Sequence, residues 1–129
     1  FPTRRSSDLN RFGAGTQHIA LLSDDIFETS KILEASRFER LKIPGEYYNE
    51  LQQKYGLAED FVKKLRGSNI LYTKNNGEYL QIYSAPIFDG FFFEIVERRD
   101  QYQGYGSKNA SARLAAQSNY KQSDRAACV

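Results

Sequence analysis

Two residues whose side chains can bind a metal ion stand in segments that are otherwise apolar. His18 is the only histidine among the 129 residues, and it lies in the strand-like segment 17–22. Glu94 interrupts the longest apolar run, 91–96. An ionised carboxylate in a buried strand is costly unless it is paired or bound to a cation. One imidazole and one carboxylate make up two thirds of the facial triad that holds non-haem Fe(II) and leaves positions open for substrate and dioxygen.

Each of the two residues also has an interpretation without a metal. A lone buried histidine is more often a structural residue than a ligand. Glu94 shares a strand face with Arg98, because side chains alternate at period two, and the pair could form a salt bridge. A second histidine for the triad is absent from the sequence. The residues alone therefore leave the metal-binding and the structural interpretations open.

The patterns around these residues predict an α+β domain. Asp24 or Asp25 offers a cap for a helix, with Glu28 as the capping-box partner of Asp25. Asn76-Gly77 carries the signal of a hairpin turn. Hydrophobic periodicity predicts strands over 17–22, 39–43, 69–73, 78–84 and 91–98, and helices over 26–36, 46–55, 58–66 and 109–122.

The order of these elements is not that of a doubly wound domain, because only one crossover helix is evident. The last three strands follow one another through short turns, which predicts a mixed, mostly antiparallel sheet packed on one main helix. Period two also sorts the side chains of the outer strands by face. Together with the family resemblance given below, this alternation leads us to expect that His18 and Glu94 point into the same concave face of this sheet.

Composition excludes several classes of protein. Apolar residues make up 40% and charged residues 26%, with 18 basic and 16 acidic side chains and a net charge of +2. No basic stripe indicates a nucleic-acid partner. No apolar run approaches the ~20 residues of a membrane helix, so we expect no membrane contact. Cys128 is the single cysteine, which excludes an internal disulfide and favours a cytoplasmic location.

Five segments together resemble a known family. GAGTQHIALLSDDI, IPGEYYNEL, LRGSNILY, GEYLQIY and FFFEIVERR look, in this order and spacing, like the C-terminal module of 4-hydroxyphenylpyruvate dioxygenases. That family has the vicinal oxygen chelate fold, in which βαβββ modules curl around one metal. The resemblance implies such a module over 10–106, half of a two-module barrel with a helical insert, followed by a C-terminal helix and tail over 107–129. Residues 1–9 share no pattern with the rest, and we expect a non-native or disordered leader there.

The resemblance assigns roles to single residues. The second His ligand of the family falls on His18 in QHIA, and its Glu ligand falls on Glu94 in FFEI. The first His ligand comes from the preceding module, which we expect this sequence to lack. The implied cofactor is Fe(II) or another divalent metal such as Mn, Mg or Co. Gln81 matches a Gln that lines the substrate pocket, although a half-buried polar residue would fit that position equally well.

The C-terminal tail departs from the dioxygenases. Their last helix follows a pattern like GFG-x-GNF-x-x-LF, and its Phe residues close over the aromatic substrate. Here Asn109 is kept, but Ala110 stands at the first Phe and Arg113-Leu114 replaces Leu-Phe. The ending NASARLAAQ instead resembles the dioxygenase-like half of bacterial fused 3-dehydroshikimate dehydratases, in which a sugar-isomerase-like barrel performs the dehydration.

Three hypotheses about function follow from the resemblance. The first, which we favour, is the metal-binding half of a fused dehydratase in aromatic or quinate and shikimate catabolism. The second is an Fe(II) dioxygenase that forms homogentisate, and the third is a non-catalytic structural module. For the intact parent we expect an enzyme, a small aromatic or hydroaromatic acid as substrate, and a homo-oligomer.

Overall fold

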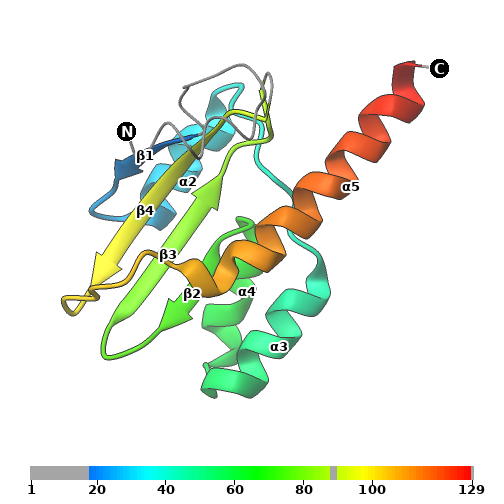
Figure 1. Cartoon of the computed structure of the whole chain (residues 1–129). Helices are drawn as coiled ribbons and strands as arrows, with labels where there is room; N and C mark the ends of the chain where they lie inside the picture. The colour runs from blue at the N-terminus through cyan, green and yellow to red at the C-terminus, as the bar shows by residue number, and fades with distance from the viewer. Residues whose placement is uncertain (1–17, 88–89, 129) are drawn as a thin grey trace, which may run out of the picture.

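The computed structural model describes residues 18–87 and 90–128, with side chains described as far as residue 119. Four strands form one sheet in the order β1-β4-β3-β2, with β1 parallel to β4 and the other pairs antiparallel. The strands are β1 His18–Leu22, β2 Leu71–Lys74, β3 Glu78–Tyr83 and β4 Phe92–Arg99. The helices are α2 Ile26–Ala35, α3 Gly45–Tyr55, α4 Glu59–Gly67, the short 3-10 helix η1 Ser107–Asn109 and α5 Ala110–Cys128 (Figure 1). The predicted mixed α+β sheet is confirmed.

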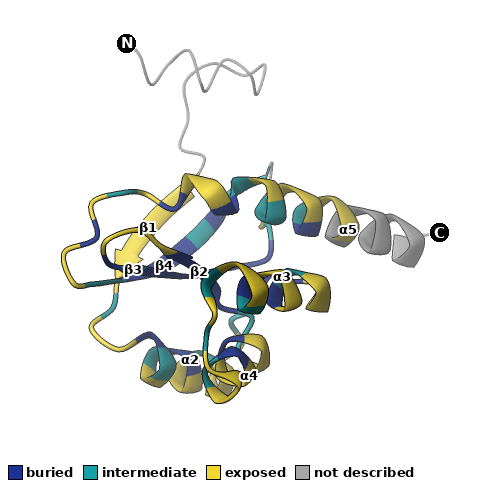
Figure 2. Cartoon of the chain, turned by 90° about the horizontal axis from the view of Figure 1, so that it is seen from below, coloured by how far each residue is buried: buried dark blue, intermediate teal, exposed yellow. Residues whose placement is uncertain are grey.

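Different parts of the chain cover the two faces of the sheet. Figure 2 shows α2 and α4 on one side of the sheet and α5 on the other. On the side of α2 and α4 lies the main apolar core, in which each fully buried aliphatic side chain contributes about 1.5–3 kcal/mol. Its best-buried aliphatic members, at 0% to 1% exposure, are Ile26, Leu41, Leu65, Ile70, Leu71, Leu80 and Ile82. The opposite face carries the polar residues described below.

Local signals in the sequence explain the ends of the helices. Asp25 caps α2, because its Oδ1 accepts hydrogen bonds from the backbone N–H groups of Phe27 and Glu28, both at 3.2 Å. Helix α3 begins after Pro44 and ends at Gly56, whose φ of 61° is the left-handed conformation that glycine adopts readily. The predicted cap at Asp25 is confirmed.

The predicted strand over 39–43 is wrong. Only an isolated bridge between Arg40 and Ser84 forms there. The backbone N–H of Ile43 donates to Oδ1 of Asn69 at 2.9 Å instead of entering a ladder, and the next residue, Pro44, has no N–H. Two backbone hydrogen bonds make this bridge, from the N–H of Leu41 to the carbonyl of Tyr83 at 2.9 Å and from the N–H of Ala85 to the carbonyl of Glu39 at 2.8 Å. The pairing does not continue to Ile43, so four of the five predicted strands remain.

The expectation that the first strand is largely buried is also wrong. All five residues of β1 are exposed, with Leu22 at 80% and Leu21 at 50%. The reason is the position of β1 at the edge of the sheet, where it pairs with β4 alone among the described residues. The predicted helix over 109–122 begins one residue later, at Ala110, and continues to Cys128. No helix in the described part of the chain is long and apolar enough to cross a membrane.

Candidate metal-binding site

His18 and Glu94 come together on adjacent parallel strands. In the ladder His18 pairs with Phe92 and Ala20 pairs with Glu94, so the two residues are diagonal neighbours on one face. Nε2 of His18 lies 3.7 Å from Oε1 of Glu94. The predicted convergence on one face of the sheet is therefore confirmed.

The geometry of this pair fits two ligands of one metal ion. With metal–ligand distances of about 2.1 Å, two neighbouring ligand atoms lie about 3.0–3.4 Å apart. The observed separation exceeds this range by a few tenths of an ångström, a difference that a side-chain rotation removes. The imidazole stacks on the ring of Phe92 with 5.1 Å between centroids and 6° between planes, which fixes its orientation. Within the described ranges, no third His, Cys, Asp or Glu joins the two.

Glu94 is held by an amide and not by an arginine. Its side chain is only 7% exposed, and its Oε2 accepts a hydrogen bond of 2.7 Å from Nε2 of Gln81. Its Oε1 is the atom that faces His18. Arg98, the alternative partner, donates instead to the backbone carbonyls of Tyr102 and Gly104. The carboxylate is thus fixed by one oxygen while the other points to the imidazole.

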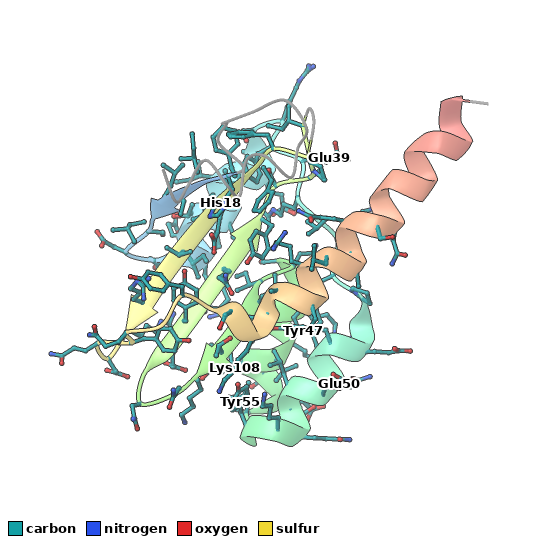
Figure 3. The ribbon with its side chains drawn as sticks, in the orientation of Figure 1. His18, Glu39, Tyr47, Glu50, Tyr55 and Lys108 are labelled. Atoms are coloured by element: carbon teal, nitrogen blue, oxygen red, sulfur yellow. The ribbon has the colours of Figure 1, made fainter. Side chains whose placement is uncertain are left out.

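Gln81 is held in turn by a chain of hydrogen bonds that reaches two helices. Nδ2 of Asn109, in η1, donates to Oε1 of Gln81 at 2.7 Å and to Oγ1 of Thr73 at 2.8 Å. The hydroxyl of Tyr47, in α3, donates to Oδ1 of Asn109 at 2.8 Å and accepts from the backbone N–H of Tyr72 at 2.8 Å. Figure 3 shows Tyr47 beside the start of α5.

No role for Tyr47 or Asn109 in this site was predicted from the sequence. The signal that could have identified Asn109 was its retention in a tail that otherwise departs from the dioxygenase pattern. Gln81 itself is 1% exposed, with both of its amide atoms engaged. Its contact with a substrate stays a prediction.

A cavity of about 490 Å³ lies over the His18–Glu94 pair. Strands β1, β3 and β4 form its floor, and the start of α5 forms one wall with Ala110 and Arg113. Polar and aromatic side chains dominate the lining: His18, Glu94, Arg98, Arg113, Tyr79, Tyr83, Tyr105 and Phe92. The cavity therefore combines two potential metal ligands with cations and aromatic rings.

Two tyrosines of the cavity, Tyr79 and Tyr83, stay protonated at neutral pH. Burial, and after it the charge of Glu94, raises the pKa of Tyr79 to about 12, although Arg98 opposes the shift. Burial and Glu94 also raise the pKa of Tyr83, against a smaller opposing effect of Arg113. Both phenols are therefore hydrogen-bond donors next to the carboxylate.

Curated relatives of this chain include 3-dehydroshikimate dehydratases and 4-hydroxyphenylpyruvate dioxygenases. The chain is 37% identical to a 3-dehydroshikimate dehydratase of Pseudomonas putida over 106 residues, which are 81% of this chain and 17% of that protein. It is 35% identical to a 4-hydroxyphenylpyruvate dioxygenase of Pyricularia oryzae, covering 75% of this chain and 25% of the relative. No family model matches the chain.

Solved structures agree with these relatives. A xylose isomerase-like TIM barrel/4-hydroxyphenylpyruvate dioxygenase fusion protein superposes with a TM-score of 0.78 and 33% identity, over 88% of this chain and 20% of that one. A 4-hydroxymandelate synthase variant from Streptomyces coelicolor gives 0.68 and 33%, over 79% and 29%. The chain thus spans less than a third of the length of each relative named here. The resemblance predicted from the motifs is confirmed: the chain matches the 4-hydroxyphenylpyruvate dioxygenase-like module and has the vicinal oxygen chelate fold.

Proposed function

We propose that His18 and Glu94 are two protein ligands of a divalent metal ion, with Fe(II) first and Mn, Mg or Co as alternatives. The observation that carries the proposal is the 3.7 Å approach of Nε2 and Oε1 on the floor of a cavity. An imidazole nitrogen and a carboxylate oxygen suit these ions. When bound, the metal supplies a Lewis acid and, as Fe(II), a site for dioxygen.

The remaining protein ligand comes, in this proposal, from a preceding module of the same parent protein. Two features of β1 support such a neighbour. Its outer edge pairs with no other described strand. Ile19, Leu21 and Leu22 are 44%, 50% and 80% exposed, and apolar side chains gathered on an open sheet edge are typical of an interface.

The chain's own residues would bind and orient. Glu94 offers Oε1 to the metal because Gln81 holds Oε2, and Phe92 keeps the imidazole of His18 in a fixed plane. Tyr83 and Tyr79 line the same cavity as protonated phenols that can donate to a substrate oxygen. Such fixed donors beside a metal are the arrangement that positions a small oxygen-rich molecule.

We infer further that the parent is a fused 3-dehydroshikimate dehydratase that acts on a small hydroaromatic acid. The similarity to a dehydratase and to a barrel–dioxygenase fusion supports this context, as does the tail. Ala110 and Arg113 line the cavity where the dioxygenase pattern has Phe and Leu, and Leu114 is 57% exposed. These two residues place no aromatic ring on the cavity wall, and Arg113 adds a charge there.

A second candidate is an Fe(II) dioxygenase that converts 4-hydroxyphenylpyruvate to homogentisate. The similarity to dioxygenases of this name favours it. An oxygen-electrode assay of the complete Fe(II)-loaded protein separates the two candidates. We expect little or no oxygen uptake with 4-hydroxyphenylpyruvate, because the wall formed by α5 lacks the aromatic seal. Brisk uptake coupled to homogentisate formation would favour the second candidate.

The metal site is tested on the complete two-module protein by elemental analysis after loading with Mn(II). We expect the His18→Ala and Glu94→Ala variants to lose most of the bound metal. Glu28→Ala is the matched control, because Glu28 is an exposed carboxylate on α2, on the other side of the sheet. Metal content as high in the His18 and Glu94 variants as in the control would show that the pair is structural.

A further inference from the structure

Arg113 is a charged residue of the cavity wall that has no acidic partner in the described part of the chain. Its guanidinium lies 5.0 Å from the ring centre of Phe92 and 5.8 Å from that of Tyr83. It donates a hydrogen bond of 3.1 Å to Oε1 of Gln117, one turn further along α5, and it also lies within hydrogen-bonding reach of the Tyr83 phenol. The other cation of the cavity, Arg98, already donates to two backbone carbonyls. These neighbours therefore fix the position of the Arg113 guanidinium but do not neutralise its charge.

Tyr83 supplies a second donor beside this guanidinium. It pairs directly with Glu94 across the β3–β4 ladder and lines the same cavity. Its oxygen accepts a hydrogen bond of 2.7 Å from Nε2 of Gln81, so its own proton remains to be donated. A planar guanidinium carries five N–H donors in a fork that matches a carboxylate. Guanidinium and phenol together form a cradle for an anionic oxygen pair.

Resting on the metal site proposed above, we propose that Arg113 and Tyr83 form a carboxylate-binding subsite of this cavity. The ligand is then a small cyclic acid whose carboxylate lies at α5. The oxygen substituents of its ring would reach the metal at His18 and Glu94. The ring of Phe92 indicates the distance that such a ligand must span. Its centre lies 5.1 Å from that of the His18 imidazole and 5.0 Å from the Arg113 guanidinium. A neutral ligand of the same shape would cover the guanidinium without pairing its charge, which is unfavourable.

The test compares two probes that differ only in charge. Calorimetry measures the binding of 3,4-dihydroxybenzoate and of 3,4-dihydroxybenzamide to the complete Mn(II)-loaded protein. We expect the acid to bind at least about tenfold more tightly than the amide, as charge-assisted bidentate pairs do. The Arg113→Leu variant should bind the two probes equally, and Tyr83→Phe should lose a smaller part of the preference.

The matched control is Lys108→Leu, which removes a cation from the same tail. Lys108 is exposed and lies on the α3 side of η1, away from His18 (Figure 3). This variant should keep the preference for the acid. Metal content and thermal midpoint should match the wild type in the variants of Arg113 and Lys108. Arg113→Lys, with its charge but without the planar fork, should show an intermediate preference.

Three results would overturn the subsite: equal binding of acid and amide by the wild type, a preference that survives in Arg113→Leu, or binding of neither probe. Benzoate and benzamide, tested on the metal-free protein, repeat the comparison without a metal-chelating pair of hydroxyls. A protein that retains no metal but prefers benzoate in an Arg113-dependent manner would contradict the metal site and still support the subsite.

Discussion

Glu94 and Glu97 lie three residues apart on β4 and are 7% and 6% exposed, but they face opposite sides of the sheet. Glu97 points toward α2, where its Oε1 accepts the backbone N–H of Ile26 at 2.7 Å and its Oε2 accepts from Arg99. Both of its oxygens are thus engaged. Glu94 has one oxygen held by Gln81 and the other directed at His18 without a hydrogen bond.

This difference distinguishes a structural carboxylate, Glu97, from the proposed metal ligand, Glu94. The cost of burying Glu97 is offset within the chain, by the first turn of a helix and a guanidinium. Glu94 directs Oε1 toward His18 on the floor of a cavity, which is the arrangement that the proposed metal site requires. The two residues are equally buried, and they differ in the hydrogen bonds that each carboxylate oxygen accepts.

The largest effect is expected on metal affinity, when this chain is tested without the second module of the proposed parent protein. Two ligands leave most of a coordination shell to water, so titration of this chain alone with Mn(II) or Fe(II) should give a dissociation constant above about 1 μM. The complete protein, with its further ligand, should bind far more tightly. Sub-micromolar binding by the isolated chain would reveal a third ligand and would weaken the comparison.

On the opposite face, replacing Glu97 should mainly affect stability. Glu97→Ala leaves the N–H of Ile26 and the guanidinium of Arg99 without their buried acceptor, and we expect a loss of about 3 kcal/mol in the free energy of unfolding. Glu94→Ala should cost less than about 1 kcal/mol, because its surroundings are a cavity that water can enter. Urea unfolding of both variants measures the difference, and equal losses would contradict the distinction drawn here.

Much of this arrangement could be predicted from the sequence because it depends on local period. Alternation along two strands, together with the family resemblance, placed His18 and Glu94 on one face, and the cap at Asp25 needs only the next three residues. The strand over 39–43 was mispredicted because its amide at Ile43 is taken by Asn69, which is distant in sequence. The exposure of β1 depends on its edge position, which no local pattern encodes.

The hydrogen bonds that hold Gln81 in the site could not be predicted from local patterns either, because they join residues that are distant in sequence. Tyr47 and Asn109 are 62 residues apart, and only the packing of α3 against η1 brings them together. Nothing in the residues around Tyr47 distinguishes it from Tyr48, whose ring is fully buried in the apolar core. Recognising such a pair requires the three-dimensional arrangement.

A smaller effect is expected from Asn109, which joins the two helices to the cavity face. Asn109→Ala removes the partners of Gln81, Thr73 and Tyr47 in a buried position, and we expect a loss of about 2 kcal/mol in stability. Lys108→Ala, at the exposed neighbouring position, should change stability by less than about 0.5 kcal/mol. Metal retention by the complete protein should fall less in Asn109→Ala than in Glu94→Ala, because Gln81 would lose orientation but not its bond to the carboxylate. An unchanged unfolding midpoint in Asn109→Ala would show that the chain of hydrogen bonds does not support the site.

The smallest effect concerns the stability of the chain at alkaline pH, to which Tyr79 on the cavity face contributes. Burial, followed by the Glu94 carboxylate, raises the pKa of Tyr79 from its ordinary value of 10.0 to about 12 in the folded chain. The unfolded chain therefore loses this proton first as the pH rises, so the contribution of Tyr79 is complete below pH 10 and is lost progressively between pH 10 and 12. The Tyr79→Phe variant of the metal-free chain should show a shallower decline of its urea midpoint over that interval than the wild type. Identical slopes in the wild type and Tyr79→Phe would mean that neither burial nor the charge of Glu94 raises the pKa of this phenol.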